Sequence, residues 1–158
     1  MKKILLLTVL AFIIAINAKA QAAKSIYFEL GGPGLASVNF DTRFSSREGG
    51  LGGRIGVGGF SVDGTSAVFI PIGINYLLGK DTKNYFEIGG GITPTIVSDT
   101  WNDETDTFTG TFGHLIFGYR LQPQHGGFTF RAFICPIIAD GGFIPYYAGI
   151  SFGYKFGR

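Results

Sequence analysis

The most constraining feature of the chain is its last apolar segment, residues 146–156, in which large or apolar side chains alternate with small or polar ones. Successive side chains of a β-strand leave opposite faces, so this segment presents one continuous apolar face and one face of Gly, Ser and Lys. The run ends in an aromatic residue, Phe156. This pattern is typical of the closing strand of an outer-membrane β-barrel.

The first 20 residues have the three parts of a secretory signal peptide: Lys2 and Lys3, an apolar run over residues 4–16, and the small-residue site at 18–20. The apolar run is shorter than the roughly 20 residues that a helix needs to cross a bilayer. This favours cleavage before Gln21 over a retained membrane helix. We therefore expect residues 1–20 to be a signal peptide and residues 21–158 to form one outer-membrane β-barrel domain.

Charge and cysteine content exclude other classes. The chain has 13 Lys plus Arg against 11 Asp plus Glu, but three of the lysines lie in the predicted signal peptide, which leaves a net charge of −1. Nucleic-acid binding therefore has no electrostatic basis here. The single cysteine, Cys135, cannot form an internal disulfide, so the fold must be stable without one.

Eight alternating segments follow the signal peptide, separated by stretches rich in Gly, Pro, Asn, Asp and Ser. We expect strands over residues 25–32, 35–44, 51–60, 67–78, 84–96, 110–121, 128–136 and 145–156. Most of them have about the length that a tilted strand needs to cross a membrane. The sequence thus predicts an all-β fold, an eight-stranded antiparallel up-and-down transmembrane β-barrel, with its longest outer loop over residues 97–109.

The charged side chains test this prediction, because a barrel in lipid must enclose them. If the apolar face of each strand points outward, all charged strand residues point inward: Glu29, Asp41, Arg43, Arg54, Glu87, Arg120, Arg131 and Lys155. His114 lies on the same face. Because the interior of an eight-stranded barrel is just wide enough for side chains to fill it, we expect these residues to form a lumen ionic network rather than to line a wide pore.

A soluble lipocalin-like periplasmic barrel, which would enclose a ligand with its apolar face, has the same alternation. The glycines argue against it, since residues such as Gly56, Gly118 and Gly153 share the charged face. On a solvent-facing surface they would weaken the strands without a return. Inside a narrow barrel they leave room for Arg and Tyr side chains.

Two groups of residues suggest activity. His114 is the candidate for a lipid-modifying enzyme, but no serine stands near it in a His-x-Ser motif, and no catalytic constellation is found. An acidic outer loop could hold calcium or bridge to lipopolysaccharide phosphates through Asp99, Asp103, Glu104 and Asp106. Its spacing lacks the order of an EF-hand, which favours a solvated loop. We expect no cofactor, no metal site and no enzymatic activity.

The chain resembles the small, mostly uncharacterised outer-membrane β-barrel proteins of Bacteroidota, and more generally eight-stranded OmpA- and OmpX-type barrels. The resemblance covers the mature chain and is carried by residues 27–32, 37–41, 70–79, 117–120, 145–147 and 150–156. It implies residence in the outer membrane, contact with lipid and lipopolysaccharide, and insertion by the outer-membrane assembly machinery. We expect a structural or surface-interaction role, with a small transport or gating barrel and a lipid-modifying enzyme as alternatives.

Overall fold

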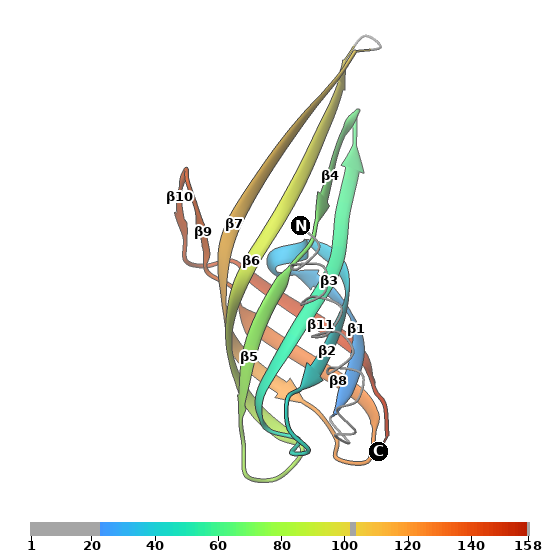
Figure 1. The fold of residues 1–158 in the computed structure, drawn as a ribbon, viewed down its shortest axis with the longest axis vertical. Helices are drawn as coiled ribbons and strands as arrows, with labels where there is room; N and C mark the ends of the chain where they lie inside the picture. The colour runs from blue at the N-terminus through green and yellow to red at the C-terminus, as the bar shows by residue number, and fades with distance from the viewer. Residues whose placement is uncertain (1–22, 102–103, 158) are drawn as a thin grey trace, which may run out of the picture.

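The computed structural model describes residues 23–101 and 104–157 (Figure 1). The predicted signal peptide, residues 1–20, lies outside this range. The described part is all-β, as predicted, with one short 3-10 helix. None of its helices has the length and apolar character that crossing a membrane would require.

Eleven strands and the 3-10 helix η1 follow one another along the chain. Their bounds are β1 Lys24–Gly31, η1 Gly32–Gly34, β2 Ala36–Arg43, β3 Gly50–Val62, β4 Thr65–Phe69, β5 Ile72–Leu78, β6 Asn84–Trp101, β7 Glu104–Leu121, β8 Gly127–Ile134, β9 Ile137–Ala139, β10 Gly142–Ile144 and β11 Ala148–Lys155.

The strands form one antiparallel sheet that closes into a ring. β1 pairs with β2 and with the last strand, β11, so that Phe28 lies opposite both Val38 and Phe152. From β11 the ring continues through β8, β7 and β6. β4 and β5 both pair with β6 on one side and with β3 on the other, which completes the ring through β2.

The described residues form eleven strands rather than the expected eight, because Pro71 divides one expected segment and a hairpin forms between the last two expected segments. Pro71 has no backbone N–H to donate and separates β4 from β5, which together occupy one place in the ring between β3 and β6. The Pro71 carbonyl still accepts a hydrogen bond from the Gly56 N–H at 2.9 Å. Pro136 follows β8, and the chain then forms the added hairpin of β9 and β10.

The prediction of an outer loop over residues 97–109 is wrong. β6 and β7 continue in register to Trp101 and Glu104, so this region is a hairpin rather than a loop. It rises well beyond the ring, together with the hairpin of β3 and β4 (Figure 1). Asp63 and Gly64 form the turn of that second hairpin, and both have positive φ values, as a two-residue turn of this kind requires.

The two ends of the ring differ in their connections. The upper end carries the turns between β1 and β2, β3 and β4, β6 and β7, and β9 and β10. The lower end carries the turns between β2 and β3, β5 and β6, and β7 and β8, together with the end of the described chain (Figure 1). η1 is buried, so the turn between β1 and β2 folds over the interior of the ring from the upper end.

Side chains alternate across the ring as the sequence predicts. Outward positions of all principal strands are apolar and exposed, for example Ile26, Phe28 and Leu30 on β1. Most inward positions are polar or glycine, apart from buried apolar side chains such as Leu77, Ile116 and Phe133, and glycines lie opposite large inward side chains. Gly118 pairs with Phe133, Gly52 with Arg43, and in both cases an added Cβ would overlap the larger side chain.

Candidate functional site

The structure places all the predicted inward charges inside the ring. Each is at most 3% exposed, as is His114: Glu29, Asp41, Arg43, Arg54, Glu87, Arg120, Arg131 and Lys155. Because buried charges are costly without partners, their contacts decide whether the interior is stable.

Arg131 on β8 is the centre of the upper half of the network. Its Nε and Nη2 donate to the two carboxylate oxygens of Glu87 at 2.8 and 2.9 Å, and its Nη1 donates to Glu29 at 3.0 Å. The guanidinium also lies 4.7 Å from the ring centroid of Tyr27 and 5.0 Å from that of Phe133. Two carboxylates and two aromatic rings therefore hold one cation in place.

Asp41 on β2 is the centre of the lower half. It accepts two hydrogen bonds from Arg120, at 3.0 and 3.1 Å, and one from Arg43 at 2.7 Å. Asn75 on β5 joins the two halves, because its amide donates to Asp41 at 2.7 Å and to Glu87 at 2.9 Å. The amide oxygen of Asn75 accepts a hydrogen bond from Arg43. Sequence reasoning missed Asn75, although it lies on the inward face of its segment.

Lys155 belongs to a separate group at the lower end. Its ammonium donates to Glu48 at 2.7 Å and to the carbonyls of Pro123 and Gln124 at 2.9 and 2.6 Å. Gln122 donates to the Glu48 carboxylate and carbonyl at 3.3 and 3.2 Å. We name Glu48, Gln122 and Lys155 the lower plug. Glu48 lies in the turn between β2 and β3, and this turn carries its side chain into the interior.

His114 and Cys135 lie in the upper interior, away from the lower plug. The His114 Nδ1 is 3.1 Å from the Thr93 hydroxyl, and its Nε2 has no hydrogen-bond partner among the described residues. Cys135 packs with Ile116 and Phe133 in a small apolar cluster against which Tyr147 lies. No hydrogen bond links His114 to a serine or a carboxylate in the described part of the chain.

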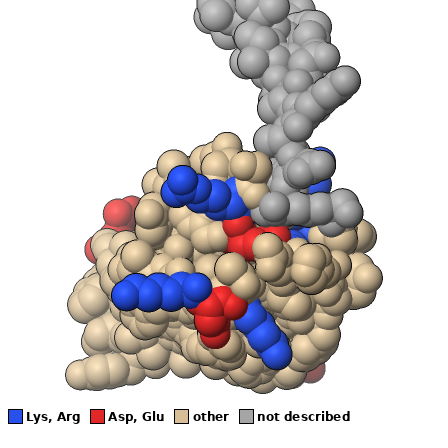
Figure 2. Space-filling view, turned by 90° about the horizontal axis from the view of Figure 1, so that it is seen from below, with Lys and Arg blue, Asp and Glu red and all other residues tan. Residues whose placement is uncertain are grey.

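Exposed charges are divided between the two ends. All the exposed Lys and Arg side chains in the described residues lie at the lower end: Lys24, Arg47, Lys80 and Lys83. Figure 2, seen from below, shows basic side chains spread over this end with acidic ones between them. Of the five acids that are exposed in the described residues, four lie at the upper end, namely Asp63, Asp99, Asp106 and Asp140. The molecule therefore has an acidic upper end and a mainly basic lower end.

Two residues of the predicted acidic loop, Asp99 and Asp106, lie towards the tip of the β6–β7 hairpin. Asp99 and Asp106 face each other directly across the two strands, and Asp99 accepts a hydrogen bond from the Thr65 hydroxyl at 2.8 Å. Asp103 lies outside the described residues, as does the side chain of Glu104. In the part that the structure describes, no three His, Cys, Asp or Glu residues are grouped so that they could hold a metal ion.

The charges of the interior nearly balance. In the part of the chain that the structure describes, five basic and four acidic side chains are buried, a surplus of one positive charge. Arg54 donates to Glu29 and Asn39 through Nη2, while its Nε and Nη1 have no partner among the described residues. The buried ion pairs and hydrogen bonds link side chains from different strands of the ring and thereby stabilise it.

Comparison with solved structures relates this fold to outer-membrane proteins. The N-terminal β-barrel domain of Pseudomonas aeruginosa OprF matches with a TM-score of 0.63 and 11% identity, over 85% of this chain and 96% of that one. The attachment invasion locus protein Ail of Yersinia pestis matches with a TM-score of 0.58 and 12% identity, over 85% and 97%. Neisserial surface protein A has a TM-score of 0.50 and 9% identity, over 87% and 94%. No protein-family model and no curated protein sequence matches the chain.

The three matching structures are all outer-membrane proteins. The chain has the fold of small outer-membrane β-barrel proteins, with sequence identities so low that the likeness is one of fold alone.

Proposed function

We propose that this protein is an eight-position transmembrane β-barrel of the outer membrane, with a structural or surface-interaction role and a lumen filled by side chains. The main support is that the polarity of the ring is the reverse of that of a soluble protein. Its charged side chains are enclosed, whereas Ile74, Val57 and Phe128 on its outside are 56–60% exposed. In water, such an outside would be an apolar patch far larger than a soluble monomer tolerates. In a bilayer it contacts acyl chains.

The orientation follows from the connections. We place the upper end, with its long hairpins, outside the cell, and the lower end, with its short turns, in the periplasm. Aromatic side chains near the lower end, among them Phe44, Tyr76 and Tyr154, are exposed on the outer surface. They fit the interfacial band that such proteins have.

The filled lumen supports a role outside transport. Ion pairs of Arg131 with Glu87 and of Arg120 with Asp41 lie inside the ring, with the lower plug below them, and we infer that together they fill the lumen. His114 has one hydroxyl partner and no serine or carboxylate hydrogen bond among the described contacts, so we assign it a packing and hydrogen-bonding role rather than catalysis.

Membrane fractionation combined with gel electrophoresis tests this proposal. The full chain, expressed with its predicted signal peptide, is expected in the outer-membrane fraction, and a folded barrel should migrate differently before and after boiling. Recovery in the soluble periplasm, with migration that does not depend on heat, would overturn the proposal and favour the lipocalin-like alternative.

One observation favours a second candidate, a small gating barrel. Among the described residues, the Nε and Nη1 of Arg54 have no hydrogen-bond partner and the buried charges leave one positive charge in surplus, which would suit a weak anion path through a rearranged interior. Recordings in planar bilayers decide between the two. Absence of stable conductance steps supports the filled lumen, while reproducible anion-selective steps that change in Arg54→Met would support gating.

A further inference from the structure

The two faces of the sheet exchange their polarity above the ring. On the outer face, one row across β3, β4, β6 and β7 consists of Ser61, Ser66, Ser98 and Thr107. On the inner face, the row directly behind it consists of Phe60, Ala67, Val97 and Phe108. Within the ring the outer face is apolar and the inner face is mainly polar, so the polarity of these two rows is the reverse of that in the ring.

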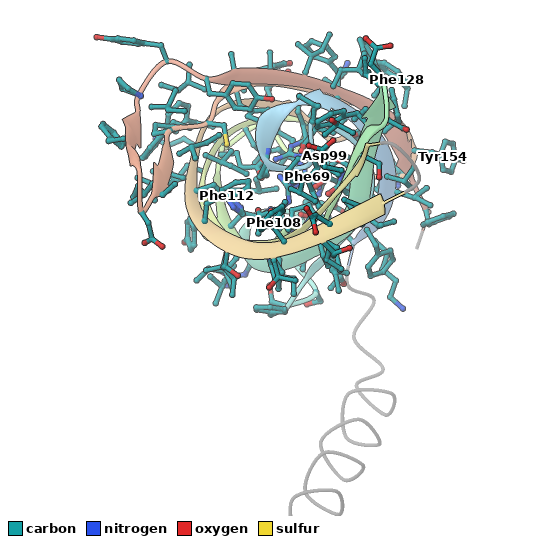
Figure 3. The ribbon with its side chains drawn as sticks, turned by 90° about the horizontal axis from the view of Figure 1, so that it is seen from above. Phe69, Asp99, Phe108, Phe112, Phe128 and Tyr154 are labelled. Carbon is teal, nitrogen blue, oxygen red and sulfur yellow. The ribbon has the colours of Figure 1, made fainter. Side chains whose placement is uncertain are left out.

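The polar side chains of the outer row suit a surface that lies above the lipid. The exposed apolar side chains of the inner row need a different explanation. Phe60 is 40% exposed and Phe108 64% exposed. Below them, the rings of Phe69 and Phe112 lie 6.4 Å apart. Figure 3, seen from above, shows Phe69, Phe108, Phe112 and Asp99 within the outline of the ring, whereas Phe128 and Tyr154 point away from its outside. An aromatic surface thus lies over the upper mouth of the ring.

Carboxylates border this surface. The next inner row towards the tip contains Asp99 and Asp106 directly opposite each other. Like charges in this position destabilise a strand pair, and a bound cation would relieve their repulsion. No Lys or Arg of the described residues is exposed at the upper end, because all of them lie at the other end. The charge of this surface therefore favours a basic partner.

The edge of β7 provides backbone groups for such a partner. Between residues 105 and 111, the described pairings of β7 are with β6 on one side, and contacts with β9 and β8 begin only at Gly113 and Phe117. An unpaired edge accepts an added strand, which gains main-chain hydrogen bonds. A strand added here would place its side chains beside Asp106 and Phe108, which are two residues apart on the same face.

We propose that this upper surface binds an extended polypeptide segment as a strand added to β7, with a basic residue beside Asp106 and an aromatic or aliphatic residue beside Phe108. The inference rests on the proposed surface-interaction role and names the chemistry of the partner. Affinity comes from main-chain pairing and from burial of the ligand's apolar side chain against the phenyl rings. Selectivity comes from the two carboxylates.

The probe is a labelled nine-residue peptide. Ser occupies every second position, and Lys and Phe occupy positions between, so that in an extended strand the Lys and Phe side chains point to the same side. The protein is inserted into nanodiscs of phosphatidylcholine, and its fold is checked by heat-dependent migration. Fluorescence anisotropy should show saturable binding that is absent from empty nanodiscs and from a peptide with Glu in place of Lys. Phe108→Ser should weaken binding about tenfold, and Asp106→Asn should weaken it and reduce its dependence on salt. Thr109→Ser, on the opposite face of β7, is the matched control and should bind as the wild type does.

Equal binding of the Lys and Glu peptides, or unchanged binding by folded Phe108→Ser, would overturn the inference while leaving the membrane barrel intact. Cross-linked dimers that disappear in Phe108→Ser would assign the surface to a second copy of the chain and would overturn it as well. Failure of the wild type to insert and to show heat-dependent migration would instead contradict the proposed function, and the inference would fall with it.

Discussion

Tyr27 on β1 and Gly153 on β11 lie directly opposite each other where the last strand closes the ring. A Cβ atom on Gly153 would overlap the backbone and Cβ of Tyr27, so only glycine fits there. The space that it leaves allows the Tyr27 ring to lie against the guanidinium of Arg131. Strand closure and the ionic interior thus depend on one small residue.

Substitution of this glycine should destabilise the barrel. Gly153→Ala is expected to lower the free energy of unfolding by about 1–3 kcal/mol, because it overpacks the site. Urea unfolding in detergent micelles measures the change. Gly110→Ala is the control, since an added Cβ there meets no atom within 4 Å. Equal stability of the two variants would contradict the close packing of Gly153 against Tyr27.

Removal of one carboxylate should be more costly than removal of a surface charge. Glu87 accepts two hydrogen bonds from Arg131 and one from Asn75, and all three residues are buried. Glu87→Ala leaves Arg131 partly unpaired in a closed interior and should cost about 3–5 kcal/mol. Asp140→Ala, at an exposed position, should change stability by less than about 0.5 kcal/mol. Comparable unfolding midpoints would show that solvent reaches the interior.

A pH dependence is expected at the lower turn between β5 and β6. The Asn84 side chain and the N–H groups of Asn84 and Lys83 donate to Asp81 and hold the pKa of its carboxyl below the ordinary value. Because the pKa is lower in the folded state, this stabilisation is present above the pKa of the unfolded chain and is lost as the pH falls through the folded value. A carboxyl-carbon NMR titration of the folded protein should give a lower midpoint than that of the unfolded chain, and an equal midpoint would contradict these contacts.

Lipid A should be unaffected by the protein. His114 lies beside Thr93, with no serine or carboxylate hydrogen-bonded to it among the described residues. Mass spectrometry of lipid A from cells with and without expression is therefore expected to give the same masses. A mass change that disappears in His114→Ala would show that the lipid-modifying alternative is correct.

The sequence identifies the enclosed charges because each of them lies on a strand, where the period of two assigns a face. Glu48 is not on a strand, and only the path of its turn carries it to Lys155, so no periodicity could reveal it. The break between β4 and β5 was missed because the alternation continues through Pro71, which has no N–H to donate. The hairpin of β9 and β10 was missed because its Asp140, Gly141 and Gly142 are typical of a turn.

The β6–β7 hairpin was missed for a different reason. Its upper part is rich in Thr, Asp and Ser, a composition that favours a loop. The alternation is nevertheless present, since Phe108, Gly110 and Phe112 continue the inward face of β7. The alternation of β7 is hard to recognise because its apolar side chains lie on the outer face from Leu115 to Leu121 but on the inner face from Phe108 to Phe112. The outward apolar pattern that marks the other strands therefore ends at Leu115.

The most direct measurement is the quenching of a single tryptophan on the outside of the ring. Phe152 on β11 is 42% exposed there, and Trp101 is the only tryptophan of the chain. In the Trp101→Phe background, the residue introduced by Phe152→Trp should be quenched by brominated phospholipids and shielded from acrylamide. The same substitution at Phe108, above the ring, should give the reverse. Acrylamide quenching at position 152 without quenching by brominated lipid would contradict the claim that the apolar side of this ring faces acyl chains.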